Sequence, residues 1–174
     1  PFLLAGLDAL EDDPRRIDPR IVRRHVALTH RNRHTEEAAD AFGRMLLELA
    51  SGSPLRDVIA AIGQPWAGPS SFEKWSREDD RRVVGRRLSP ACYLPESFTA
   101  ALHFVWKYHD DFAAGVLANA HAGGDNCHRG VVVGAILGAA NGVPRDWLRG
   151  LRSMERLRCD VLDGNGGPGS GAGR

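Results

Sequence analysis

Asn119 to Gly142 reads N-A-H-A-G-G-D-N-C-H-R-G-V-V-V-G-A-I-L-G-A-A-N-G. A Gly-Gly pair and an aspartate stand directly before an apolar segment with glycine at every fourth position, namely Gly130, Gly134 and Gly138. Residues four apart lie on one face of a helix, so the spacing predicts a helix with a glycine face. Each glycine costs such a helix about 0.5–1 kcal/mol relative to alanine, which indicates that another element packs closely against this face.

The turn before this predicted helix collects groups that bind ligands. Gly123 and Gly124 free the backbone at a helix N-terminus, where unpaired N–H groups and the helix dipole favour an anion. They are therefore either a diphosphate-binding turn or simply a flexible one. Asp125 fits an ordinary N-cap. Together with Cys127 and His128 it also offers the ligand types that zinc prefers.

The rest of the chain shows helical periodicity without sustained two-residue alternation. The pattern predicts an all-α fold. A Gly-rich tail at 164–174 is predicted to be disordered, which leaves 1–163 as the helical domain. The predicted helices cover about 18–29, 35–52, 53–63, 71–84, 95–109, a segment from 110 or 111 through 117, the glycine-rich helix to 142, and 144–157.

Composition narrows the class of protein. A chain of 174 residues fits one domain, and a net charge of +1 does not favour a binder of polyanions. Seven arginines lie between Arg15 and Arg33 without an aromatic residue among them. We interpret them as a solvated helix face, so nucleic-acid binding is not expected. Three cysteines without a C-x-x-C pair favour a reducing, cytoplasmic location. The apolar run from Val131 to Ala140 is too short to span a membrane.

The order of these motifs resembles the ADP-ribosylglycohydrolase family. That family carries a C-terminal G-G-D-T-D-T signature before a glycine-rich helix, matched here by Gly123-Gly124-Asp125 and by a V-P-R-D-W segment from Val143. A-C-Y-L-P and Y-H-D-D-F segments upstream are also similar to it. The resemblance covers about His25 to Leu151. It implies the C-terminal part of an all-α orthogonal multi-helix bundle and hydrolysis of the bond between ADP-ribose and an acceptor.

The same resemblance implies the residues of a site. Asp125 matches the first acid of the signature, a magnesium ligand in the family, while Cys127 and His128 stand at the second acid and the final threonine. A thiol and an imidazole are poor magnesium ligands. We expect metal ligands at Asp125, Cys127 and His128 and substrate contacts at His121 and the two glycines; no catalytic residue is nominated. The partner implied is an ADP-ribosylated protein or an ADP-ribose-containing small molecule.

Two alternatives stay open. The N-terminal G-D-x-x-G and T-D-D-T-like motifs of the family do not occur, and the chain begins at Pro1 without a Met. We therefore expect a fragment that is inactive alone. The first alternative is a non-catalytic helical module that binds a nucleotide or a protein. The second alternative is an HD-type metal phosphohydrolase, in which His109 and Asp110 join His103 and Asp125. The competing interpretation of the Y-H-D-D segment is a helix end followed by an N-cap.

Overall fold

Helices make up the regular structure of residues 19–152, which are the residues that the computed structural model describes. No β-strand occurs in this range, so the all-α prediction is confirmed. Residues 19–142 form one compact unit, and α10 belongs to a second unit that starts at Val143. In chain order the elements are α2 (Pro19–Ala27), α3 (Arg33–Ala50), α4 (Leu55–Ile62), α5 (Pro69–Ser76), α6 (Asp80–Arg82), the π-helical turn η2 (Val83–Arg87), α7 (Glu96–Lys107), α8 (Phe112–Ala122), α9 (Asn126–Asn141) and α10 (Arg145–Gly150).

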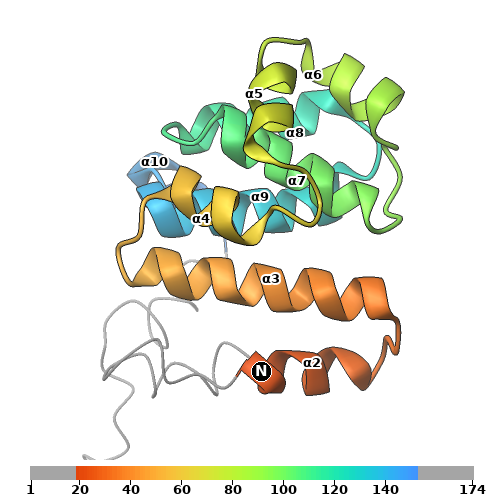
Figure 1. The fold of residues 1–174 in the computed structure, drawn as a ribbon. Coiled ribbons are helices and arrows are strands. Elements are labelled where there is room, and N and C mark those ends of the chain that lie inside the picture. Colours follow the sequence, from red (N-terminus) through yellow and green to blue (C-terminus); the bar gives the residue numbers. More distant parts are fainter. Residues whose placement is uncertain (1–18, 153–174) are drawn as a thin grey trace, which may run out of the picture. The chain divides into compact units, whose positions relative to one another are not determined.

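Helix α7 is the centre of the first unit. Every residue from Phe98 to Trp106 is buried, as expected for a helix that is covered on all sides. Helices α4, α5, α8 and α9 all pack against it, and Figure 1 shows them around it. The structure also buries Thr99 and His103, so polar groups here need partners inside the protein.

The predicted glycine face of α9 is only partly in close contact. A Cβ added at Gly130 would lie 3.1 Å from the Asn119 side chain, but one at Gly134 would meet nothing within 4 Å. The prediction of close packing is therefore wrong at Gly134. A closer approach than at Gly130 occurs at Gly115 of α8, where an added Cβ would collide with the Leu137 side chain of α9.

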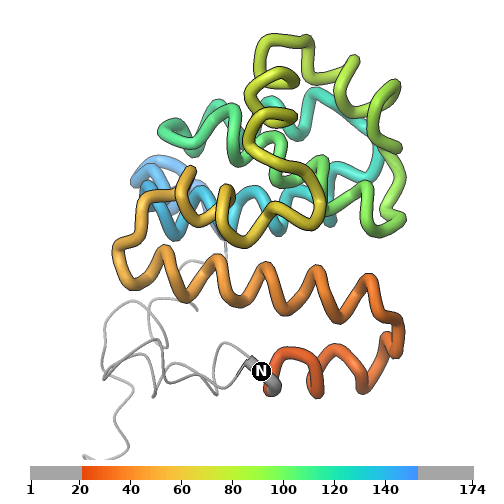
Figure 2. The backbone as a smooth tube through the Cα atoms, viewed as in Figure 1, coloured from red at the N-terminus to blue at the C-terminus, as the bar shows by residue number. Residues whose placement is uncertain are grey.

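Helices α2 and α3 run antiparallel to each other (Figures 1 and 2). Gly43 allows this approach, since a Cβ there would lie 3.2 Å from Cγ2 of Val22. Helix α3 begins at Arg33, two residues before the predicted start at residue 35. Asn32 is the N-cap, and its Oδ1 accepts hydrogen bonds from the backbone N of His34 at 2.9 Å and of Thr35 at 3.4 Å.

The prediction of one continuous helix over 71–84 is wrong, because α5 ends at Ser76 and α6 begins only at Asp80. Asp79 caps α6 by accepting a 3.0 Å hydrogen bond from the backbone N of Arg81, and the carbonyl of Glu78 accepts from Nζ of Lys107 at 2.9 Å. The predicted tail and the end of the last predicted helix lie outside the described residues. Among residues 19–152, no helix has the length and apolar character needed to cross a membrane.

Candidate functional site

The turn from Gly123 to Asp125 is held against the segment around Pro90. Gly123 and Gly124 have φ of 73° and 66°, a region that favours glycine. A Cβ at Gly124 would lie 2.6 Å from Cβ of Pro90, and the backbone N of Asp125 donates to the carbonyl of Pro90 at 2.8 Å. The Gly-Gly pair is thus required by a tight turn and a close backbone approach.

The carboxylate of Asp125 does not cap the helix that follows it. Asp125 is at the N-cap position of α9, yet its side chain makes no capping hydrogen bond, so the N-cap interpretation is wrong for the side chain. Nδ1 of His128 lies 2.7 Å from Oδ1 of Asp125. A carboxylate only accepts, which means that Nδ1 carries the proton. The second oxygen, Oδ2, is buried, and no group among residues 19–152 donates a hydrogen bond to it, so it is available to a ligand.

Asp125 and His128 line a cavity of about 570 Å³, here called the Asp125 pocket. Three separate stretches of the chain form it: the start of α3 with the loop before it, the Cys92–Phe98 segment, and the start of α9. The lining contains three imidazoles, one carboxylate, one thiol and one guanidinium. The lining residues are His30, Asn32, His34, Thr35, Cys92, Tyr93, Leu94, Ser97, Phe98, Asp125, His128, Arg129 and Val132.

Arg129 supplies a buried positive charge to the Asp125 pocket. Arg129 is only 3% exposed, and the carbon of its guanidinium lies 5.4 Å from the ring centroid of Phe104. Nε donates to Oδ1 of Asn119 at 2.6 Å, and Nη2 donates to the carbonyls of Asn119 at 3.2 Å and Gly123 at 2.8 Å. Burial lowers the pKa of Arg129, and the charge of Asp125 opposes that shift. The sequence pattern did not single out Arg129, although a charge in the first turn of a helix that then becomes apolar was a visible signal.

The structure brings only some of the predicted site residues together. Cys127 is exposed, with Sγ 3.6 Å from Oδ1 of Asn126, and it does not line the Asp125 pocket. His121 lines a different cavity, of about 570 Å³, and its carbonyl accepts from Nε of Arg81 at 3.0 Å. Gly123 and Gly124 shape the turn without lining the pocket. Asp125 and His128 are thus the predicted residues that meet in the Asp125 pocket.

No three His, Cys, Asp or Glu side chains within residues 19–152 are placed to hold a metal ion together. For the HD-type alternative, Nδ1 of His109 lies 3.7 Å from Oδ1 of its neighbour Asp110, while His103 has a different partner. Asp111 caps α8 by accepting from the backbone N of Ala114 at 2.9 Å, and His103 is fully buried against Asp80. The interpretation of the Y-H-D-D segment as a helix end followed by an N-cap is confirmed at Asp111.

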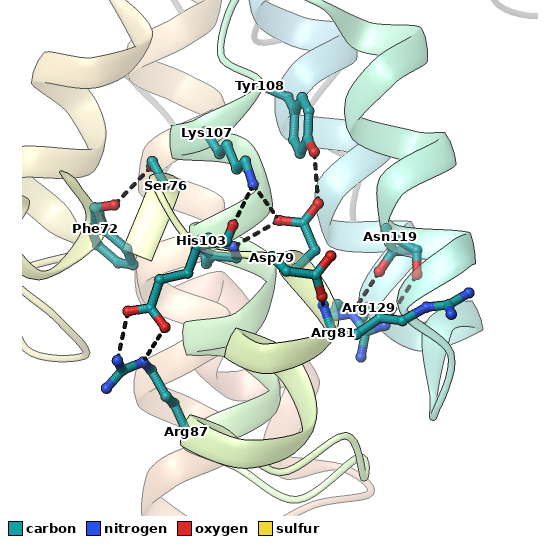
Figure 3. A network of polar contacts seen from close by, with 12 residues as sticks. Phe72, Ser76, Asp79, Arg81, Arg87, His103, Lys107, Tyr108, Asn119 and Arg129 are labelled. Atoms are coloured by element: carbon teal, nitrogen blue, oxygen red, sulfur yellow. Dashed lines mark hydrogen bonds and ion pairs between the residues drawn. The ribbon is translucent and has the colours of Figure 1, made fainter. Parts of the chain in front are cut away.

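A polar network around Asp80 is the largest feature that sequence reasoning missed. Three side chains of α7 and its C-cap converge on one carboxylate (Figure 3). Lys107 Nζ and His103 Nε2 lie 2.9 and 3.2 Å from Oδ1, and the Tyr108 hydroxyl donates to Oδ2 at 2.6 Å. Burial alone would raise the pKa of Asp80, but the three partners outweigh it and lower the pKa to about 2. Burial and the hydrogen bond to Asp80 raise the pKa of Tyr108.

Comparison with known proteins gives one match. The family model described as ADP-ribosylglycohydrolase matches residues 2–167, which is nearly the whole chain and includes the Asp125 pocket. No curated protein and no solved structure matches this chain.

Proposed function

This chain belongs to the ADP-ribosylglycohydrolase family, and we propose that the Asp125 pocket is its binding site for the ADP-ribosyl group. Membership supports an ADP-ribosylglycohydrolase-like function, and enzymes of this family act on ADP-ribosylated substrates. One observation carries the choice of pocket. The buried Oδ2 of Asp125 has no hydrogen-bond partner among residues 19–152, and a buried carboxylate oxygen without a partner is costly unless a ligand supplies one.

The charge of the pocket supports a phosphate-bearing ligand. Arg129 lines the pocket with two of its three guanidinium nitrogens, Nε and Nη2, engaged by protein oxygens. Within residues 19–152 no acceptor bonds to Nη1. A guanidinium that is held rigidly by other groups loses little freedom when it binds an anion. In this proposal Arg129 attracts the negatively charged ligand, and Asp125 accepts a hydrogen bond from a ribose hydroxyl or holds a cation. Tyr93, which is 76% exposed at the same pocket, offers a flat surface for a base.

The family generally depends on a metal, and the residues present fit this requirement in part. Magnesium takes oxygen ligands, and the unpartnered Oδ2 of Asp125 is suited to supply one. His128 would orient that carboxylate through its 2.7 Å hydrogen bond, as partners of ligating groups commonly do. Cys127 does not line the pocket, so it would not supply a second ligand inside it. We therefore propose Asp125 as a magnesium ligand, and the metal, when bound, would polarise the substrate oxygen.

A non-catalytic binding module is the second candidate, and one observation favours it. Cys127 stands where the family signature has its second acid, and its side chain is exposed outside the pocket. In that case the pocket binds ADP-ribose without hydrolysing a bond. The two candidates share the ligand and differ in turnover.

Calorimetric titration with ADP-ribose tests the shared part of the proposal. We expect the wild-type chain to bind and Asp125→Asn to bind at least about tenfold more weakly, since a hydrogen bond to a charged group is worth about 1.5–3 kcal/mol. Asp110→Asn, which alters an exposed aspartate outside the pocket, is the matched control. Equal affinity in wild type and Asp125→Asn would remove the pocket from the proposal. Release of ADP-ribose from modified protein with magnesium, absent in Asp125→Ala, would identify the enzyme. We expect no release from this chain alone.

A further inference from the structure

A second cavity, of about 430 Å³, borders the Asp125 pocket; here it is called the arginine pocket. His34 lines both cavities. Leu94 lines the first and Pro95, the next residue, lines the second. Trp66 of the arginine pocket packs edge-on against Phe98 of the Asp125 pocket, with ring centroids 4.9 Å apart. The two cavities therefore share a wall formed by these side chains.

Three arginines line this second cavity, Arg23 from α2 and Arg33 and Arg44 from α3. Two of these arginines are paired with acidic side chains. Nε of Arg33 lies 2.7 Å from Oε1 of Glu37, and Nη2 of Arg23 lies 3.4 Å from Oδ2 of Asp40. Arg44 is exposed and forms no ion pair within residues 19–152. The cavity thus carries one positive charge in excess, on a guanidinium that bonds to no acceptor among residues 19–152.

The position of this charge follows from how α2 and α3 pack. Gly43 lets α2 approach α3 closely enough for Val22 to be buried between them. Arg23, the next residue in α2, then reaches the same cavity as Arg44, which follows Gly43 in α3. A close helix contact therefore sets two guanidinium groups beside one cavity.

We propose that the arginine pocket binds a phosphate group. Guanidinium donors match phosphate oxygens in bidentate geometry. The arginines of this cavity together offer more donors than a ligand with a single carboxylate can accept. Arg33 is 85% exposed in its ion pair, and such a surface pair is weak, so Arg33 is free to turn toward a phosphate. The half-buried indole of Trp66 provides an aromatic wall for the sugar or base beside it. The site does not depend on the ADP-ribosyl proposal, although it borders that pocket.

Two sources of the phosphate fit this geometry. Because the cavities share a wall, a single ligand long enough to pass His34 would reach both. Alternatively, a separate nucleotide occupies the arginine pocket while the Asp125 pocket holds another ligand. The chemistry is the same in both cases, and competition between two ligands distinguishes them.

Titration with inorganic pyrophosphate tests the site, with wild type, Arg44→Gln and Arg24→Gln compared at one salt concentration. Arg24 is also an exposed arginine, on α2, and does not line the cavity, so its variant removes the same charge elsewhere. We expect Arg44→Gln to weaken pyrophosphate binding about tenfold and Arg24→Gln to change it less than twofold. Melting curves should show both variants folded like wild type, because both side chains are exposed. Equal loss in the two variants, or no loss in Arg44→Gln, would overturn the proposal.

A second titration adds ADP-ribose to the wild-type chain saturated with pyrophosphate. Displacement of pyrophosphate assigns the phosphate to one ligand that spans both cavities, and simultaneous binding assigns it to a separate nucleotide. Both results support the site when Arg44→Gln weakens pyrophosphate binding. If ADP-ribose does not bind at all, the ADP-ribosyl proposal fails, while Arg44-dependent binding of pyrophosphate still supports the arginine pocket. If the wild-type chain does not bind pyrophosphate, the proposal of the arginine pocket is overturned.

Discussion

Arg129 of α9 donates a 2.6 Å hydrogen bond from Nε to Oδ1 of Asn119 on α8, and both residues are buried. Nδ2 of Asn119 in turn donates to the carbonyl of Asn126 at 2.9 Å, and Nη2 of Arg129 donates to the carbonyl of Gly123. These bonds tie the end of α8 to the start of α9. The turn that carries Asp125 is therefore fixed from both sides, which presents its carboxylate to the pocket without a capping bond.

Replacing Arg129 should loosen this turn and weaken the pocket. Arg129→Met leaves Oδ1 of Asn119 and the carbonyl of Gly123 without their buried donor, so we expect the free energy of unfolding to fall by about 3 kcal/mol. Urea denaturation measures this loss. Arg77→Met, at an exposed ion pair with Glu73, should change it by no more than about 0.5 kcal/mol. Similar small losses in both variants would contradict a role for Arg129 in the turn.

Asp125→Asn should separate ligand binding from helix capping. The Asp125 side chain makes no capping bond, so the loss of about 1 kcal/mol expected for removing a cap should not occur in Asp125→Asn or in Asp125→Ala. Without metal, both variants should melt close to wild type. Added magnesium should stabilise wild type more than either variant, since an ion that binds only the folded state shifts stability by mass action. Melting curves with and without magnesium measure the difference. Equal stabilisation of wild type and Asp125→Asn would exclude Asp125 as a ligand.

The Asp80 network predicts a specific dependence of stability on acid. The pKa of Asp80 is about 2 in the folded chain, against a reference value of 3.8. Because the folded pKa is the lower one, the stabilisation is fully present above about pH 4 and is lost as pH falls toward 2. The shift corresponds to about 2 kcal/mol. The difference in unfolding free energy between wild type and Asp80→Asn should shrink by about that amount from pH 6 to pH 2. Parallel curves for the two proteins would show that Asp80 is not the group responsible.

Two glycine substitutions should have opposite signs. A Cβ at Gly115 would collide with Leu137 and lie 3.2 Å from Cβ of Tyr108, so Gly115→Ala should cost about 1–3 kcal/mol through overpacking. Gly134 is inside α9 with nothing within 4 Å of its added Cβ. Gly134→Ala should therefore stabilise the chain by about 0.5–1 kcal/mol. Thermal unfolding of the pair checks both. A loss in Gly134→Ala would indicate that another surface packs on that face.

The sequence alone determined the features that depend on neighbours along the chain. Apolar residues at helical spacing predicted α4, α7, α8 and α9 within a few residues of their observed bounds, since a helix is set by contacts three and four residues apart. Asp111 was identified as a possible cap for the same local reason. The Gly123-Gly124-Asp125 motif, together with the glycine-rich helix and the V-P-R-D-W segment after it, predicted the family that the match over residues 2–167 shows.

Only the tertiary structure decided which groups meet. Spacing placed Asp125, Cys127 and His128 within one helical turn, yet the turn geometry directs Cys127 outside the pocket. It also leaves Oδ2 of Asp125 without a hydrogen-bond partner among residues 19–152. His103 was considered as a metal ligand and is instead paired with Asp80, 23 residues away in the chain. The Asp125 pocket joins stretches that begin at His30, Cys92 and Asp125. Contacts of this range depend on how whole helices pack around α7, and a local pattern of residues does not encode that packing.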